Sequence, residues 1–207
     1  GSTGSAHASV DLGTGQLKVD ATSTAGFTAV ATGWEFVTFS GSGVVNFSFA
    51  VDGSLSNRIP AGMVYVEPAV RVYDVTDWTT GYFASTSGIQ FSAYNGSGSS
   101  FPYRVGSAYG VKAVRGTGST GCTDYFISVS DCTVDSAGTV VPVDLSLSGS
   151  FGAVFGKLYL VELQLSAATY NQQLSVVPQL ADFSHTATFD FTNLNGLTYQ
   201  SSSGQFL

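Results

Sequence analysis

The sequence predicts an all-β protein: an antiparallel β-sandwich of jelly-roll type, built from about ten to twelve short strands. Three observations support this fold class. Apolar and polar residues alternate with a period of two along much of the chain, clusters of Gly, Asn, Asp and Ser interrupt the alternation, and helical periodicity is nearly absent. Strands without intervening helices favour two packed antiparallel sheets over an α/β fold.

The segment VVNFSFAVDG shows the alternation most clearly. A turn is expected after it, at Asp52-Gly53, because this dipeptide is typical of tight hairpins. The apolar residues that should share one face of this strand are Val45, Phe47, Phe49 and Val51.

The same alternation predicts the remaining strands. The segment KLYLVELQL (residues 157–165) is nearly continuous in apolar residues, which indicates a central strand covered on both faces. Pro68 cannot donate a ladder hydrogen bond, so we expect an edge or a bulge there. Residues 93–121 are rich in Gly and Ser and should form a long surface loop. Strands are expected within residues 9–23, 34–41, 44–53, 63–75, 88–94, 141–151, 157–167, 185–200 and 204–207.

The length of 207 residues suits one domain, which we assign to residues 9–207. Residues 1–8 are expected to be a flexible N-terminal arm or a cloning remnant, outside the fold. No apolar run approaches the roughly 20 residues that a membrane-spanning helix needs.

The composition limits the partners of the chain. Charged residues make up 10%, whereas 29 Ser, 21 Thr and 25 Gly supply much of the expected surface. The net charge of −7, with only seven Lys and Arg, opposes binding to nucleic acid, because phosphate contacts depend on basic residues. Such a composition is typical of exported β-proteins.

Two cysteines, Cys122 and Cys132, fit a disulfide in an exported chain. Bridged Cα atoms lie within about 7 Å of each other. The chain would therefore have to fold back near residues 127–129. The alternative is two separate buried thiols, and the spacing matches no zinc motif.

The closing segment brings Asp182, Ser184 and His185 together in sequence. In a regular strand Asp182 and Ser184 point to one face and His185 to the other, so these three residues should not form a catalytic triad. The chain also has no GxSxG motif.

Glycoside hydrolysis needs two carboxylates, and the chain has three glutamates: Glu35, Glu67 and Glu162. Glu162 shares its expected face with Leu158, Leu160 and Gln164, so burial would raise its pKa. No second Glu stands two residues away on the same strand. A glycan-active enzyme using Glu162 or Glu67 is therefore the least favoured alternative.

Carbohydrate binding without catalysis is a stronger alternative. Trp78 is the best single candidate, because it lies in the segment DVTDWTTGYF and flat aromatic rings stack on sugars. The full candidate set is Trp78, Asp74, Asp77, Tyr82 and Trp34.

Several aspartates could supply oxygen ligands to Ca²⁺. No EF-hand motif or repeat organises them, and the alternative is that they start turns, as Asp commonly does. We expect no required cofactor. The aspartates concerned are Asp74, Asp77, Asp124, Asp131 and Asp135.

Three segments together resemble a known family: residues 8–23, residues 36–56 and the closing segment LADFSHTATFDFTNLNGLTYQSSSGQFL. They are similar to the exported ectodomains of PEP-CTERM proteins, which an exosortase sorts to the bacterial surface. In that family a strand, a "GLTY"-like hairpin and an "SSSGQFL"-like end precede the sorting tag. The chain departs from the pattern because no Pro-Glu-Pro tag, membrane span or basic tail follows Leu207, so an anchor is expected to be missing there.

The resemblance implies Sec export from a Gram-negative bacterium that makes exopolysaccharide, and it implies no catalytic residues. The leading expectation is a non-enzymatic structural or adhesive protein of the cell surface or biofilm matrix. Self-assembly into filaments is one version, in which the arm Gly1 to Ser9 adds as a strand to a neighbour's sheet edge. The other expectation is a module that holds extracellular polysaccharide.

Overall fold

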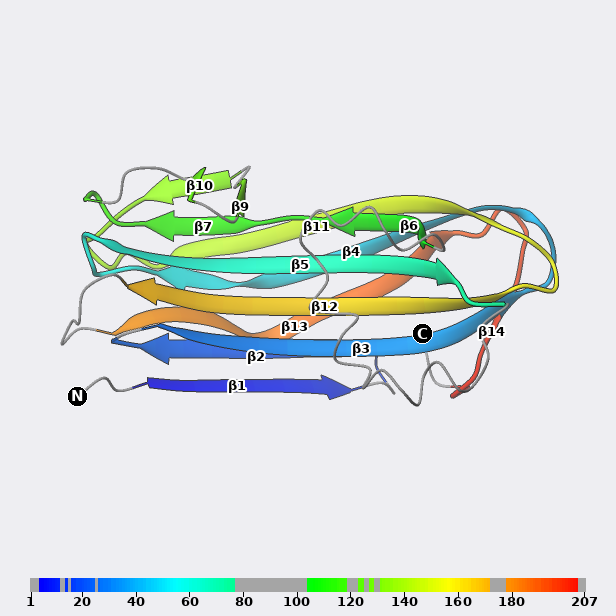
Figure 1. Cartoon of the computed structure of the whole chain (residues 1–207), viewed down its shortest axis with the longest axis horizontal. Helices are drawn as coiled ribbons and strands as arrows, with labels where there is room; N and C mark the ends of the chain where they lie inside the picture. Colours follow the sequence, from blue (N-terminus) through cyan, green and yellow to red (C-terminus); the bar gives the residue numbers. More distant parts are fainter. Residues whose placement is uncertain are drawn as a thin grey trace.

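The computed structural model confirms an all-β sandwich. Within the residues that the structure describes there is no helix, and two sheets pack face to face (Figure 1). No helix in this part of the chain is long and apolar enough to cross a membrane. The described residues are 4–11, 14, 16–24, 26–76, 104–118, 123–124, 127–128, 131–171 and 178–204.

The five-stranded sheet, here called sheet A, is antiparallel throughout. In spatial order its strands are β1 (Gly4–Asp11), β2 (Gln16–Ser23), β13 (Gln179–Asn193), β4 (Gly43–Ser56) and β11 (Val141–Ala153).

The seven-stranded sheet, here called sheet B, lies in front of sheet A in Figure 1. Six of its strands lie side by side, in the order β10 (Asp131–Val134), β7 (Lys112–Arg115), β5 (Gly62–Asp74), β12 (Leu158–Asn171), β3 (Phe27–Phe39) and β14 (Tyr199–Ser201). The seventh strand, β6 (Arg104–Tyr109), pairs with β5 next to β7. The two-residue strands β8 (Thr123–Asp124) and β9 (Ile127–Ser128) form a separate pair.

The strand order is that of a jelly roll. From β2 to β5 the chain alternates between the sheets, and from β11 to β13 it alternates again. Sheet A thus contains the strand order β2-β13-β4-β11. Sheet B contains the order β3-β12-β5, followed by β6 and β7, which both pair with β5. Two interleaved Greek keys produce these two orders. Very short strands such as β8, β9 and β14 raise the number of strands above the expected ten to twelve.

The core lies between the sheets and follows the predicted alternation. Val45, Phe47, Phe49 and Val51 of β4 are at most 1% exposed, and they belong to the same buried cluster as the inward residues of β12. An aromatic cluster closes one end of the core. There the Phe39 ring lies 5.7 Å from Phe151, 5.8 Å from Tyr159 and 5.7 Å from Phe191.

The turn predicted at Asp52-Gly53 is wrong, because β4 runs on without a break to Ser56. Gly53 serves close packing instead. A Cβ atom built on it would lie 2.3 Å from the Phe183 ring and 2.5 Å from the Asp182 carbonyl. A glycine here allows β13 to approach β4, which local turn statistics cannot reveal.

Pro68 is in an interior strand, so the expected edge is wrong. β5 pairs with β12 in continuous register through Pro68 and Leu165. On its other side β5 pairs with β7 up to Val66 and with β6 from Ala69 onward. Pro68 thus lies where the neighbouring strand changes, and the missing donor is tolerated there.

Residues 93–121 are not a loop throughout. β6 and β7 lie within this stretch, and both pair with β5. The strand expected at 88–94 lies outside the described residues.

Both chain ends differ from expectation. The first eight residues were expected outside the fold, but from Gly4 onward they form β1, paired with β2 in unbroken register. The closing segment was expected to form a hairpin. The chain does turn at Asn195 and Gly196, which have φ angles of 50° and 84°, but β14 then crosses to sheet B and pairs with β3.

Cys132 lies in β10 and is not a free thiol. Its expected partner Cys122 lies outside the described residues, so the bridge between them stays a prediction.

Candidate functional site

The outer face of sheet B, which points away from sheet A, carries a row of functional side chains across three strands. In the register Glu162 on β12 stands opposite Trp34 on β3 and opposite Arg71 on β5. The Arg71 Nη1 atom donates to Glu162 Oε1 at 2.5 Å and to Gln164 Oε1 at 3.0 Å. We call Trp34, Glu162 and Arg71 the Trp34 row.

The ion pair in this row is buried, since Glu162 is 1% and Arg71 7% exposed. Burial raises the pKa of Glu162, as expected from the sequence, while the charge and hydrogen bond of Arg71 act in the opposite direction. The Arg71 guanidinium thus holds the Glu162 carboxylate in place between β5 and β12.

The three glutamates do not form a glycosidase pair. Glu67 shares the outer face with Glu162 but is offset by four residues in the register, or about 13 Å along the strands. Glu35 belongs to the opposite face of β3. Paired glycosidase carboxylates lie about 5 to 9.5 Å apart.

Glu35 instead anchors the segment after β14. It accepts hydrogen bonds from the Ser202 hydroxyl, from the Ser203 amide at 3.3 Å and from the Phe36 amide at 2.9 Å. Burial alone would raise its pKa, but these bonds together lower it below the ordinary value.

The predicted carbohydrate set is not brought together where the structure describes it. Asp74 lies at the end of β5, where it binds the Lys157 ammonium and accepts from the Thr76 hydroxyl at 2.7 Å. Trp34 lies on β3, with β12 between the two strands. Trp78, Asp77 and Tyr82 fall outside the described residues.

The aspartates considered for Ca²⁺ have other partners. Asp131 lies 3.0 Å from the Lys112 ammonium, and Asp135 accepts from the amides of Ala137 and Thr139, both at 2.9 Å. Across the described ranges no group of three or more His, Cys, Asp or Glu residues is arranged to hold a metal ion. Asp77 and the side chain of Asp124 lie outside them.

The Asp-Ser-His segment forms a bulge in β13, where the register shifts against both neighbouring strands. Asp182 Oδ1 accepts from the Ser184 amide at 3.1 Å and from the Ser184 hydroxyl at 2.7 Å. Asp182 and Ser184 thus contact each other in a local turn, where a regular strand was expected. The side chain of His185 lies outside the described part.

The β1 strand is the feature that the sequence did not indicate as structure. All eight residues of β1 are exposed, it pairs with β2 alone, and no described strand lies beyond it (Figure 1). The segment GSAHASVD has only one large apolar residue, Val10, so the alternation of apolar and polar residues gave no signal of a strand there.

No protein-family model, curated protein or solved structure matches this chain.

Proposed function

We propose that this protein is a non-enzymatic, extracellular structural or adhesive component of a bacterial surface or matrix, and that its copies associate through the edge of β1. The observation that carries this proposal is that β1 is a long sheet edge with an unbroken register and without Lys, Arg or Pro. Unpaired backbone donors and acceptors along such an edge are a template for another strand.

The other described edges are protected. β10 has four residues and β14 has three, which limits pairing. β11 carries Pro142 and Asp144, and β6 packs against it, with Gly106 close to Ser150 and Phe151.

β1 is eight residues long and packs against β3, with Gly4 beside the Phe27 ring, but its backbone pairs with β2 alone. It contains no Lys, Arg or Pro, and its register with β2 runs without a bulge from Gly4 to Asp11. Its two ionisable residues are His7, which lies 3.4 Å from Asp20, and Asp11. A second copy could therefore add its own β1 with little charge repulsion at the junction, as strand addition requires.

The location belongs to the same proposal. The resemblance to PEP-CTERM ectodomains and the surface rich in Ser, Thr and Gly favour export from a Gram-negative bacterium. The predicted Cys122–Cys132 bridge would fit an oxidising compartment. Peptide mapping without reductant checks it: a linked peptide pair is expected, and two unlinked peptides would contradict the bridge.

Electron microscopy of the purified chain at rising concentration tests the association. We expect paired molecules for the unchanged protein, or larger assemblies where a second contact exists, and separate monomers for a Ser5→Lys/Ser9→Lys variant, because lysines block edge pairing. The matched control is Thr188→Lys/Thr192→Lys, which adds the same charge at the same four-residue spacing to exposed positions of the interior strand β13. Monomers alone for the unchanged protein at every concentration would overturn the proposal.

A further inference from the structure

We propose that the outer side of β3, together with β14, binds a neutral polysaccharide chain, with Phe155 and Trp34 as its two aromatic contacts. This inference goes beyond association of the protein with itself. We call the surface from Trp34 through Thr38 and Ser40 to Phe155 the β3 track.

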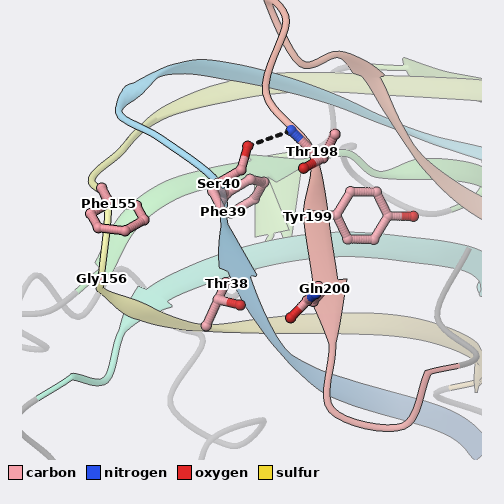
Figure 2. A pocket seen from close by; sticks show the side chains of 8 residues that line it. All are labelled: Thr38, Phe39, Ser40, Phe155, Gly156, Thr198, Tyr199 and Gln200. Carbon is pink, nitrogen blue, oxygen red and sulfur yellow. Dashed lines mark hydrogen bonds between the residues drawn. The ribbon is translucent and has the colours of Figure 1, made fainter.

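One end of the β3 track is a cavity of about 290 Å³ where β3, β14 and the turn between β11 and β12 meet (Figure 2). None of the residues lining it carries a charge, although the chain as a whole has a net charge of −7. An uncharged ligand rich in hydroxyl groups suits such a lining. The lining residues are Thr38, Phe39, Ser40, Phe155, Gly156, Thr198, Tyr199 and Gln200.

Four polar side chains form a grid on this end of sheet B. Thr38 stands opposite Gln200 in the register. One step further, the Ser40 amide donates to the Thr198 carbonyl at 2.9 Å, and the Thr198 amide donates to the Ser40 hydroxyl oxygen at 2.9 Å. Three hydroxyls and one amide thus face the same side, and each can donate and accept, as sugar hydroxyls do.

Phe155 provides the apolar contact beside this grid. Its side chain is 69% exposed, the largest exposure among the described large apolar residues. The turn that presents the ring is fixed. The Phe155 amide donates to the Ser42 hydroxyl oxygen at 2.9 Å, and the Val154 amide donates to the Tyr159 hydroxyl oxygen at 2.8 Å. An exposed ring on an ordered turn is prepared for stacking.

Trp34 provides the second apolar contact. It lies on the same face of β3 as Thr38 and Ser40, and it is 42% exposed. Trp34 and Ser40 are six residues apart, or about 20 Å along the strand. Beside Trp34 the Arg71–Glu162 ion pair neutralises itself. The β3 track therefore offers aromatic contacts at both ends, the half-buried Phe36 and then hydroxyls between them, and no net charge, which fits an extended neutral glycan.

Affinity gel electrophoresis with three neutral polysaccharides, dextran, galactomannan and xyloglucan, tests this inference, with acidic alginate as a fourth probe. We expect at least one neutral polysaccharide to retard the protein and alginate not to. Phe155→Ala and Trp34→Ala should each weaken that retardation about tenfold, since each removes one stacking contact worth roughly 1.4 kcal/mol.

The matched control is Tyr170→Ala. Tyr170 is an aromatic residue of β12 that is 47% exposed and does not line the cavity. This variant should bind like the unchanged protein, and circular dichroism verifies that all variants are folded. The Ser5→Lys/Ser9→Lys variant should also keep its binding, which separates failure of this inference from failure of the proposed association. No retardation by any neutral polysaccharide, or equal retardation of Phe155→Ala, Trp34→Ala and Tyr170→Ala, would overturn the inference.

Discussion

At the scale of single residues, the Arg71–Glu162 pair is the charged contact with the largest consequence for stability. Both side chains are buried on the outer face of sheet B, and Gln164 shares the Arg71 donor. Removing water from two charges is costly, so such a pair contributes little net stability while both partners remain. Losing one partner leaves the other charge buried and unpaired.

We therefore expect Arg71→Met to lower the free energy of unfolding by about 3 to 5 kcal/mol. The double variant Arg71→Met/Glu162→Met should be clearly more stable than this single variant, because no buried charge remains. Urea denaturation of the three proteins measures both differences. A single variant as stable as the unchanged protein would show that Glu162 finds another partner or reaches water.

Glu35 makes stability depend on pH. Because its folded-state pKa is lowered, the stability it provides is present above the ordinary glutamate pKa of about 4.3 and is lost as the pH falls through the folded-state value. The urea midpoint of the unchanged protein should therefore fall more steeply between pH 5 and pH 3 than that of Glu35→Gln. Parallel profiles of the two proteins would contradict this role of Glu35.

At the scale of elements, two glycines of β11 allow a matched comparison. A Cβ atom on Gly149 would lie 2.3 Å from the buried Phe47 ring, whereas one on Gly152 would meet nothing within 4 Å. Both glycines belong to the same strand and pair with β4. Their substitution by alanine differs mainly in the space available.

We expect Gly149→Ala to cost about 1 to 3 kcal/mol, because the Phe47 ring has to shift within a packed core. Gly152→Ala should be neutral or slightly stabilising, since it restricts the unfolded chain. Thermal unfolding of both variants measures the difference. Equal melting temperatures would show that the core can move aside at Phe47.

Local pattern predicted the interiors of β4 and β12 well. The inward residues of β4 and the two-sided burial of β12 follow from the spacing of apolar residues, as does the raised pKa of Glu162. The same reasoning failed where tertiary contacts decide. Gly53 and Pro68 are both usual signals for the end of a strand, yet each lies inside a long one. Gly53 allows β13 to pack closely against β4. Pro68 lies where the strand beside β5 changes, so its missing hydrogen-bond donor is tolerated.

At the scale of the whole molecule, the sequence pattern could not predict which strands lie side by side in each sheet. The β3 track depends on the pairing of β14 with β3 and on the turn before β12, which are far apart in the chain. Of the residues predicted for sugar binding, Trp34 belongs to the β3 track, whereas Asp74 is held by Lys157 at another strand. Phe155 was overlooked because a single aromatic residue in a turn resembles any other.

The edge of β1 likewise exists only in the assembled sheet. Residues with small side chains gave no reason to place a strand there, but β2 provides a complete ladder for them. This leaves the backbone of β1 paired on one side only along eight residues, although β1 packs against β3 much as β11 at the opposite edge packs against β6. A molecule with one open edge can pair with one other copy through it, and larger assemblies then need a second contact.

Sedimentation velocity over a wide range of protein concentrations tests this central claim most directly. The unchanged protein and the Thr188→Lys/Thr192→Lys control should sediment faster as concentration rises, whereas Ser5→Lys/Ser9→Lys should stay a monomer throughout. A monomeric unchanged protein at every concentration, or association of the edge variant equal to that of the control, would contradict pairing through β1.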